Sequence, residues 1–295
     1  EAINILSQIV KPKTGNEYNA LLFGFRNMTE VIIPSSIKKI CEFAFHNCIN
    51  LKYVRFNDDS RLQIIKKYAF SNSSIENIVI PKNIKEIKHY AFFKCQNLHS
   101  IEFCENCQLE RIGEYSFSET SIATIKIPKE VTNIGQYCFS QCSNLQNIEF
   151  EIGCKLQIIN NDLFNGTKID KLIIPKNVKE IKEGWINGLN YLKSISIPTN
   201  DNYYLTCENK IIINSINNRQ IINNLLFSCR DITEIIIPST IKMICESAFS
   251  NCEQLIKVEF MNNSELEIIN KYAFYKTSIE YIEIPKSTKE INEYA

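Results

Sequence analysis

The residues best suited to chemistry in this 295-residue chain are its twelve cysteines and three histidines. Thiols can form disulfides, bind zinc or act as nucleophiles, and histidine can transfer protons near neutral pH. Cys104 and Cys107 form a C-x-x-C motif. A structural zinc site usually takes four ligands from two such pairs, and the sequence has neither a second pair nor an H-x-x-x-H. We therefore expect no metal and no cofactor.

The spacing of the cysteines shows how the chain is organised. Cys48, Cys95 and Cys142 are each 47 residues apart, and Cys252 holds the same position in a later copy. Prolines repeat at the same interval, at Pro34, Pro81, Pro128 and Pro175, and again at Pro238 and Pro285. Between them a strand-like run ends in Phe56, Phe103, Phe150 and Phe260, so successive runs end 23 and 24 residues apart, as from Ile33 to Phe56 and from Phe56 to Ile80. The repeat is a doublet.

Each copy carries the spacing L-x-x-L-x-L, as in Leu51, Val54 and Phe56. Since alternate residues of a strand face opposite ways, the last two apolar residues point inward and the one between them points outward. A second cluster, such as Ile40, Ala44 and Phe45, has the spacing of a short helical or 3-10 turn. We predict an α/β repeat solenoid with a parallel strand ladder and such turns on the opposite side, stacked into one continuous core.

The repeat argues against chemistry at the cysteines. Members of the main column would lie two coils apart, about 10 Å, whereas bridged cysteines need Cα atoms within about 7 Å. They fit a buried turn position as small apolar residues. Cys207 and Cys229 lie outside that column, so a disulfide between them stays open.

Nothing in the sequence supports catalysis. His46 and His99 hold positions filled elsewhere by varied residues, and no Ser-His or Cys-His pairing can be argued from the sequence, including for His89. The eight glycines form neither a G-x-G-x-x-G nor a phosphate-binding loop. We expect a protein that is not an enzyme.

The charge and hydropathy exclude two further classes of partner. The 33 basic and 33 acidic residues leave no net charge to attract nucleic acid. Apolar runs are far shorter than the roughly 20 residues that cross a bilayer, so we expect no membrane insertion in this segment. The chain starts at Glu1 without a leader, and the repeat stops at Ala295 where a Phe is due, so we expect a fragment of a longer protein.

The signature I-P, then I-x-x-x-A-F, then C-x-x-L-x-x-I-x-F can be followed through Pro34, Ala44-Phe45 and Cys48 to Phe56. It resembles the BspA-like leucine-rich repeats. The partner half-repeat, with Ala69-Phe70-Ser71, looks like the version in trichomonad-type surface antigens. This resemblance implies a leucine-rich repeat fold, display at the cell surface or secretion, adhesion to protein, host-cell or matrix ligands, and recognition as an antigen.

One stretch departs from the pattern, because the step from Ile197 to Ile237 is 40 residues long. We expect a leucine-rich repeat array over 1–198, a divergent insertion with a hairpin over 199–226, and a continued array over 227–295. Asn217-Asn218 between two Ile-rich runs reads as the hairpin turn. The segment is interpreted as a joint between arrays, or as a binding edge carrying Trp185.

The outward position of each strand should line the face that repeat proteins commonly use for partners. Its signs alternate, which suits a broad protein surface better than a small-molecule pocket. The candidate binding face, with three aromatic residues near the insertion, comprises Ile32, Arg55, Val79, Glu102, Lys126, Glu149, Ile173, Trp185, Ser196, Tyr203, Tyr204, Ile236 and Glu259. The alternative is an ordinary solvated sheet face.

Two functions follow as hypotheses. The first is a segment of a cell-surface adhesin or antigen, compatible with the N-glycosylation sequons at Asn27, Asn72, Asn165 and Asn262. The alternative is an intracellular, cytoplasmic scaffold for protein–protein interaction, since reducing compartments keep thiols unpaired. In either case exposed end coils could pair two copies into a homodimer.

Overall fold

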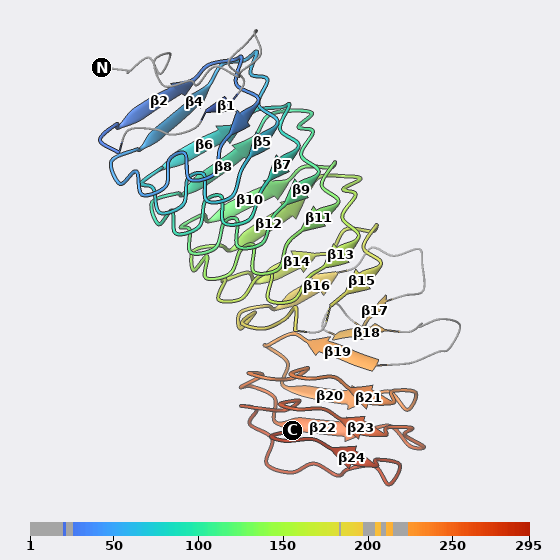
Figure 1. Cartoon of the computed structure of the whole chain (residues 1–295). Coiled ribbons are helices and arrows are strands. Elements are labelled where there is room, and N and C mark those ends of the chain that lie inside the picture. Colours follow the sequence, from blue (N-terminus) through green and yellow to red (C-terminus); the bar gives the residue numbers. More distant parts are fainter. Residues whose placement is uncertain (1–19, 22–25, 183, 197–203, 208–210, 215–223) are drawn as a thin grey trace. The chain divides into compact units, whose positions relative to one another are not determined.

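The computed structural model describes residues 20–21, 26–182, 184–196, 204–207, 211–214 and 224–295 (Figure 1). The chain divides into two compact units. Unit 1 comprises residues 1–168 and 180–188, and unit 2 comprises 169–179 and 189–295. A single continuous solenoid over both arrays stays a prediction.

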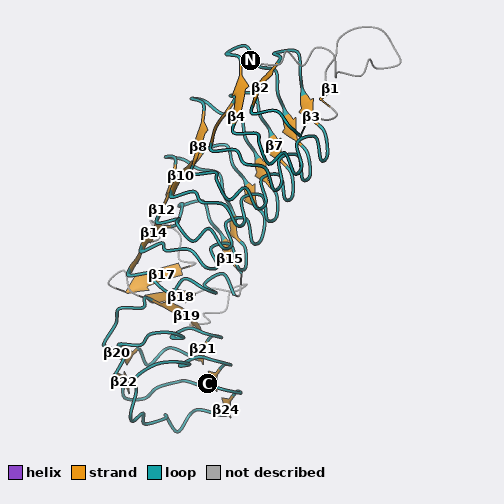
Figure 2. Ribbon diagram, turned by 90° about the vertical axis from the view of Figure 1, so that its left-hand side faces the viewer, coloured by secondary structure: helices purple, strands orange, loops and turns teal. Residues whose placement is uncertain are grey.

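Most coils carry one long strand and one short strand on a different side (Figures 1 and 2). The long strands of unit 1 are β2 (Glu30–Ile33), β4 (Tyr53–Phe56), β6 (Asn77–Ile80), β8 (Ser100–Phe103), β10 (Thr124–Ile127) and β12 (Asn147–Phe150). Its short strands are β1 (Ala20–Leu21), β3 (Lys39–Ile40), β5 (Ile64–Ile65), β7 (Glu86–Ile87), β9 (Arg111–Ile112), β11 (Asn133–Ile134), β13 (Ile158–Ile159) and β15 (Glu180–Ile181).

Unit 2 repeats this plan around an irregular segment. Its long strands are β14 (Lys171–Ile173), β16 (Ser194–Ser196), β20 (Glu234–Ile237) and β22 (Lys257–Phe260), and its short strands are β21 (Met243–Ile244), β23 (Ile268–Ile269) and β24 (Glu290–Ile291). Three further strands are β17 (Tyr204–Cys207), β18 (Ile211–Asn214) and β19 (Asn224–Ser228).

The predicted strands and their inward faces are confirmed in unit 1. Ile78, Ile101 and Ile125 lie in β6, β8 and β10 and are buried. The long strands pair in parallel, as Ile78 with Ile101 in the register of β6 and β8. Buried phenylalanines from the turns stack along the same core, Phe45 on Phe70 at 5.0 Å and Phe70 on Phe92 at 5.1 Å between ring centroids. The coils therefore share one apolar interior within the unit.

Pairing of the long strands alternates between complete and incomplete. β2 with β4, and β6 with β8, match over four residue pairs. β4 with β6 matches over only two, ending at Val54 and Ile78. Pro81 directly follows β6 at this shorter interface. Because proline has no N–H, it ends the ladder there, as the 47-residue proline interval predicts.

The predicted helical or 3-10 turns are wrong, since no helix of either kind occurs in the parts of the chain that the structure describes (Figure 2). The fold is therefore an all-β solenoid instead of α/β. Phe45 donates its backbone N–H to the Ala69 carbonyl of the next coil at 2.6 Å, while Ala44 donates to Cys41, three residues back, at 3.2 Å. A helix would direct every N–H along its own chain, so bonding between coils replaces it.

The turns also contain residues with a left-handed backbone conformation. The turn of each coil places a residue in the left-handed region, such as Phe43 at φ 59° and Tyr90 at φ 58°, and often a second one four residues later, such as Asn47 at φ 57°. This conformation costs about 1–2 kcal/mol for a residue with a side chain. It must therefore be offset by contacts that the turn makes.

The irregular segment of unit 2 is antiparallel. β17 pairs with β18, and β18 with β19, each in antiparallel register, and β19 then rejoins the parallel ladder through β21. The residues of the expected hairpin turn, Asn217-Asn218, lie outside the described residues. No helix in the described parts of the chain is long and apolar enough to span a bilayer.

Candidate binding face

The outward residues of the long strands form a row of cross-strand pairs on one side of each unit. In unit 1 Ile32 pairs with Arg55, Val79 with Glu102, and Lys126 with Glu149, while in unit 2 Ile173 pairs with Ser196 and Ile236 with Glu259. Strand alternation holds them outward because their neighbours fill the core. Ser196 is half-buried and the other nine are exposed. These pairs are the strand face.

The apolar members of the strand face are unusually open to solvent. Val79 is 50% exposed and Ile236 is 56% exposed, with Ile32 and Ile173 close to these values. In the described registers each lies beside a charged or hydroxyl-bearing residue, so apolar and polar groups alternate across every pair. Apolar groups bordered by polar ones are a composition that protein interfaces share.

Ion pairs join neighbouring coils at and beside the strand face. Arg55 Nε lies 2.7 Å from Glu30 Oε1 on the neighbouring strand. Lys52 Nζ lies 3.0 Å from Glu76 Oε1, and the Tyr53 hydroxyl donates to Glu76 Oε2 at 3.3 Å. The hydrogen bond from Lys52 lowers the pKa of Glu76. Exposed pairs of this kind contribute little to stability but hold the side chains in place.

Of the three aromatic residues proposed for the edge of this face, the structure describes the side chain of Trp185 alone, and it does not join the face. Trp185 is only 2% exposed, so its ring packs in the core and the expectation that it offers an open aromatic anchor is wrong. It fills the place that Ala-Phe holds in other coils, which explains its burial. Tyr203 lies outside the described residues, and of Tyr204 the structure describes only its place in β17.

The four sequons lie in different surroundings. Asn27 and Asn262 are exposed in turns. The Asn72 side chain is exposed but donates to Asn47 Oδ1 at 2.6 Å, and half-buried Asn165 donates to Asp162 Oδ1 at 3.4 Å. Exposure and freedom from hydrogen bonds favour modification, so the structure ranks the first two above the others.

The cysteine column consists of hydrogen-bonded structural thiols. Cys95 Sγ donates to the Phe70 carbonyl at 3.0 Å, and Cys142 Sγ donates to the Phe117 carbonyl at the same distance. Burial raises the pKa of both thiols to about 11, so both stay protonated at neutral pH. A protonated buried thiol is a poor nucleophile. Cys229 is buried and the Cys207 side chain is not described, so their disulfide stays a prediction.

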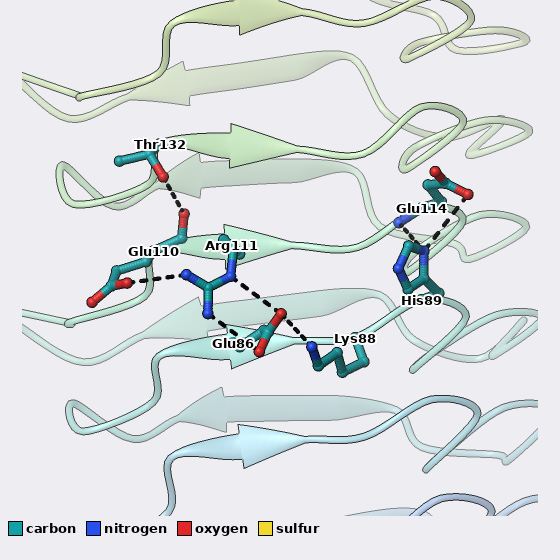
Figure 3. A network of polar contacts seen from close by, with 7 residues as sticks. All are labelled: Glu86, Lys88, His89, Glu110, Arg111, Glu114 and Thr132. Carbon is teal, nitrogen blue, oxygen red and sulfur yellow. Dashed lines mark hydrogen bonds and ion pairs between the residues drawn. The ribbon is translucent and has the colours of Figure 1, made fainter.

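A second polar cluster lies on the short-strand side and was not foreseen from the sequence (Figure 3). Arg111 Nε and Nη2 lie 3.2 and 3.4 Å from the two carboxylate oxygens of Glu86 on the neighbouring strand, and Lys88 Nζ lies 2.6 Å from Oε1. Burial raises the pKa of Glu86, but the bonds from Arg111 and Lys88 outweigh it and leave the pKa lowered. Nearby, His89 Nδ1 accepts the Glu114 N–H at 3.2 Å. The cluster ties coils together.

An aromatic ladder on the turns was also missed. Its half-exposed rings occupy the first left-handed position of successive coils and stack at 4.7–5.1 Å, in the order Phe43, Tyr68, Tyr90, Tyr115 and Tyr137. The signal was present as tyrosines spaced 22 or 25 residues apart. Each stacked pair contributes about 0.5–1.5 kcal/mol beyond burial, enough to offset much of the backbone strain.

The stacked coils, the strand ladders and the repeated phenylalanine core define a leucine-rich repeat solenoid. The family model described as BspA type leucine rich repeat region, in six copies, matches residues 17–146, 110–209 and 200–295. The chain belongs to this family, which confirms the resemblance seen in its motifs. A search of curated proteins by sequence finds no match.

Several solved structures share the fold. The pneumococcal vaccine antigen PcpA has a TM-score of 0.70 at 18% identity, covering 94% of this chain and 72% of that one. A leucine-rich repeat protein from Bacteroides ovatus has 0.62 at 21%, covering 97% and 81%. A leucine rich cell surface protein from Faecalibacterium prausnitzii has 0.53 at 18%, covering 91% and 88%. At these identities the likeness shows the fold alone.

Proposed function

We propose that this chain is a non-enzymatic binding module, a segment of a cell-surface or secreted adhesin or antigen that holds a protein ligand on its strand face. The observation that carries the proposal is the row of exposed apolar residues paired in register with charged ones. Membership of the BspA-type family and the fold shared with a vaccine antigen and a cell surface protein support the choice of compartment.

The strand face suits a macromolecular partner. Protein interfaces combine apolar centres with polar surroundings and reach a standard size of about 800 Å² per partner. A row of cross-strand pairs repeated along each unit offers such a surface. Its balanced charges favour a partner without strong net charge, which agrees with the absence of nucleic-acid features in the sequence.

The test is a binding assay with the purified chain on cultured host-type cells and immobilised matrix proteins. Placing Asp at Val79, Ile173 and Ile236 should lower binding at least tenfold, because each change puts a charge where a partner must bury apolar surface. The matched control places Asp at Ile49 and Ile152, which are exposed apolar residues outside the strand face. Equal loss in both variants would contradict the proposal.

The second candidate is a cytoplasmic scaffold, favoured by the buried thiols of Cys95 and Cys142, which donate hydrogen bonds to backbone carbonyls. The two candidates share the strand face but differ in compartment. Labelling of intact cells with an impermeant reagent separates them, since an adhesin must be labelled and a cytoplasmic scaffold must be protected.

A further inference from the structure

Where the strand ladder is interrupted, backbone N–H and C=O groups are left without a partner on the neighbouring strand. Cys104, which follows β8, donates its N–H to the Ile80 carbonyl at 3.0 Å. At the preceding interface the equivalent residue is Pro81, whose ring nitrogen has no hydrogen to donate to the Phe56 carbonyl. Since β4 and β6 stop pairing at Val54 and Ile78, the Phe56 amide also has no ladder partner on β6.

A cavity of about 420 Å³ opens at this break. Tyr53, 41% exposed, and Val79 line its apolar part. Asp58 and Lys82, of opposite charge, also line it, as does Arg55, whose charge is paired with Glu30 at 2.7 Å. The volume falls within the range of about 300–1,000 Å³ typical of ligand sites. We call this cavity the β4–β6 recess.

Unit 2 contains the same arrangement. Met261, which follows β22, donates its N–H to the Ile237 carbonyl at 3.0 Å, whereas Pro285 cannot donate to the Phe260 carbonyl. Residues 281–284 form no strand, so β22 has no paired neighbour on that side in the described chain. A cavity of about 770 Å³ lies there, lined by both segments. A recess beside a phenylalanine and a proline thus occurs in both units.

The groups in each recess select the chemistry of the occupant. A residue of an extended peptide presents its N–H and C=O to the same side, so it can exchange two hydrogen bonds with one residue opposite, as in an antiparallel pair. It can thus satisfy the amide and the carbonyl of Phe56 together. Apolar residues such as Val79 in the first recess and Met261 in the second lie beside charged residues of both signs, which favours an uncharged segment that carries an apolar side chain.

We infer that the β4–β6 recess and its counterpart at Phe260 and Pro285 each bind an extended, uncharged peptide segment through backbone hydrogen bonds to the phenylalanine. This is strand addition at an open ladder, a recurring way of recognising peptides. The inference rests on the proposed function of the strand face and names the chemistry of its partner.

The experiment is an NMR titration of the ¹⁵N-labelled chain with a blocked peptide, acetyl-Thr-Ile-Thr-Val-Thr-amide. The amides of Phe56 and Phe260 should shift saturably. A copy N-methylated at the central residue lacks the donor and should bind about fivefold more weakly, the loss expected for one hydrogen bond. Pro81→Ala supplies the missing N–H and closes the first recess, so the Phe56 response should disappear while the Phe260 response stays. Pro285→Ala should do the reverse.

Each variant thus carries its own folding control in the other unit. The inference is overturned if neither amide shifts, or if the shifts survive in the variant that closes the same recess. It is also overturned if a β-linked oligosaccharide shifts these amides and the peptide does not. Cell or matrix binding that still depends on Val79 and Ile236 would in that case leave the proposed function standing.

Discussion

The aromatic ladder allows a test of how turn strain is offset. Tyr90 stacks on Tyr68 and on Tyr115, both at 4.8 Å between centroids, while its backbone is left-handed at φ 58°. Replacing Tyr90 by Ala removes two stacks, roughly 1–3 kcal/mol, and keeps the strain. Replacing it by Gly removes the same stacks but relieves a strain of about 1–2 kcal/mol.

Glycine ordinarily destabilises by about 0.5–1 kcal/mol relative to alanine, because it loses more chain entropy on folding. At Tyr90 the strain relief should exceed this cost. We therefore expect Tyr90→Gly to be up to about 1.5 kcal/mol more stable than Tyr90→Ala. Both should be less stable than the parent. Urea unfolding followed by circular dichroism measures the three midpoints.

Tyr53 provides the control, because it is an exposed tyrosine in the strand β4 and has no positive φ. There Gly should be the less stable replacement. If Gly were the worse choice at Tyr90 as well, the left-handed turn would not be a source of strain and the reasoning would be refuted.

Three further changes probe the core. Gly113→Ala should destabilise by about 1–3 kcal/mol, since its Cβ would lie 2.4 Å from the His89 backbone nitrogen. Thermal melting against the parent chain checks this, and an unchanged melting temperature would contradict it. Burial raises the pKa of Cys95 from 9.0 to about 11, so the protonated thiol contributes roughly 3 kcal/mol of stability that is present below pH 9 and lost as the pH rises to 11. The urea midpoint should therefore fall between pH 9 and pH 11, and it should fall less in Cys95→Ala. Arg230→Ala should expose amides of β19 to hydrogen exchange, because the buried guanidinium bonds three carbonyls.

Much of the fold could be predicted because the sequence repeats at a regular interval. Residues such as Ile78 and Ile101 recur at one position of every coil, so a single strand pattern, read once, applies to the whole array. The proline interval likewise places the ends of strands, since the missing N–H is a property of the residue alone. The outward column could be listed for the same reason, because strand alternation is local.

The turns could not be predicted, because their hydrogen bonds go to the next coil. The spacing of Ala44 and Phe45 is equally compatible with a helical turn, and only the bond from Phe45 to Ala69 excludes one. The sequence likewise could not show that Trp185 is buried, because its burial depends on residues of the neighbouring coils.

The order of side chains along the chain thus decided which residues point inward, where strands end and which family the chain joins. Stacking decided the rest: left-handed turns, the ladder of tyrosines, the thiols bonded to carbonyls and the recesses beside Phe56 and Phe260. These features depend on groups 22 to 25 residues apart that meet only after the coils are stacked. The sequence determined the features that depend on the properties of single residues, and the tertiary structure decided those that depend on contacts between two coils.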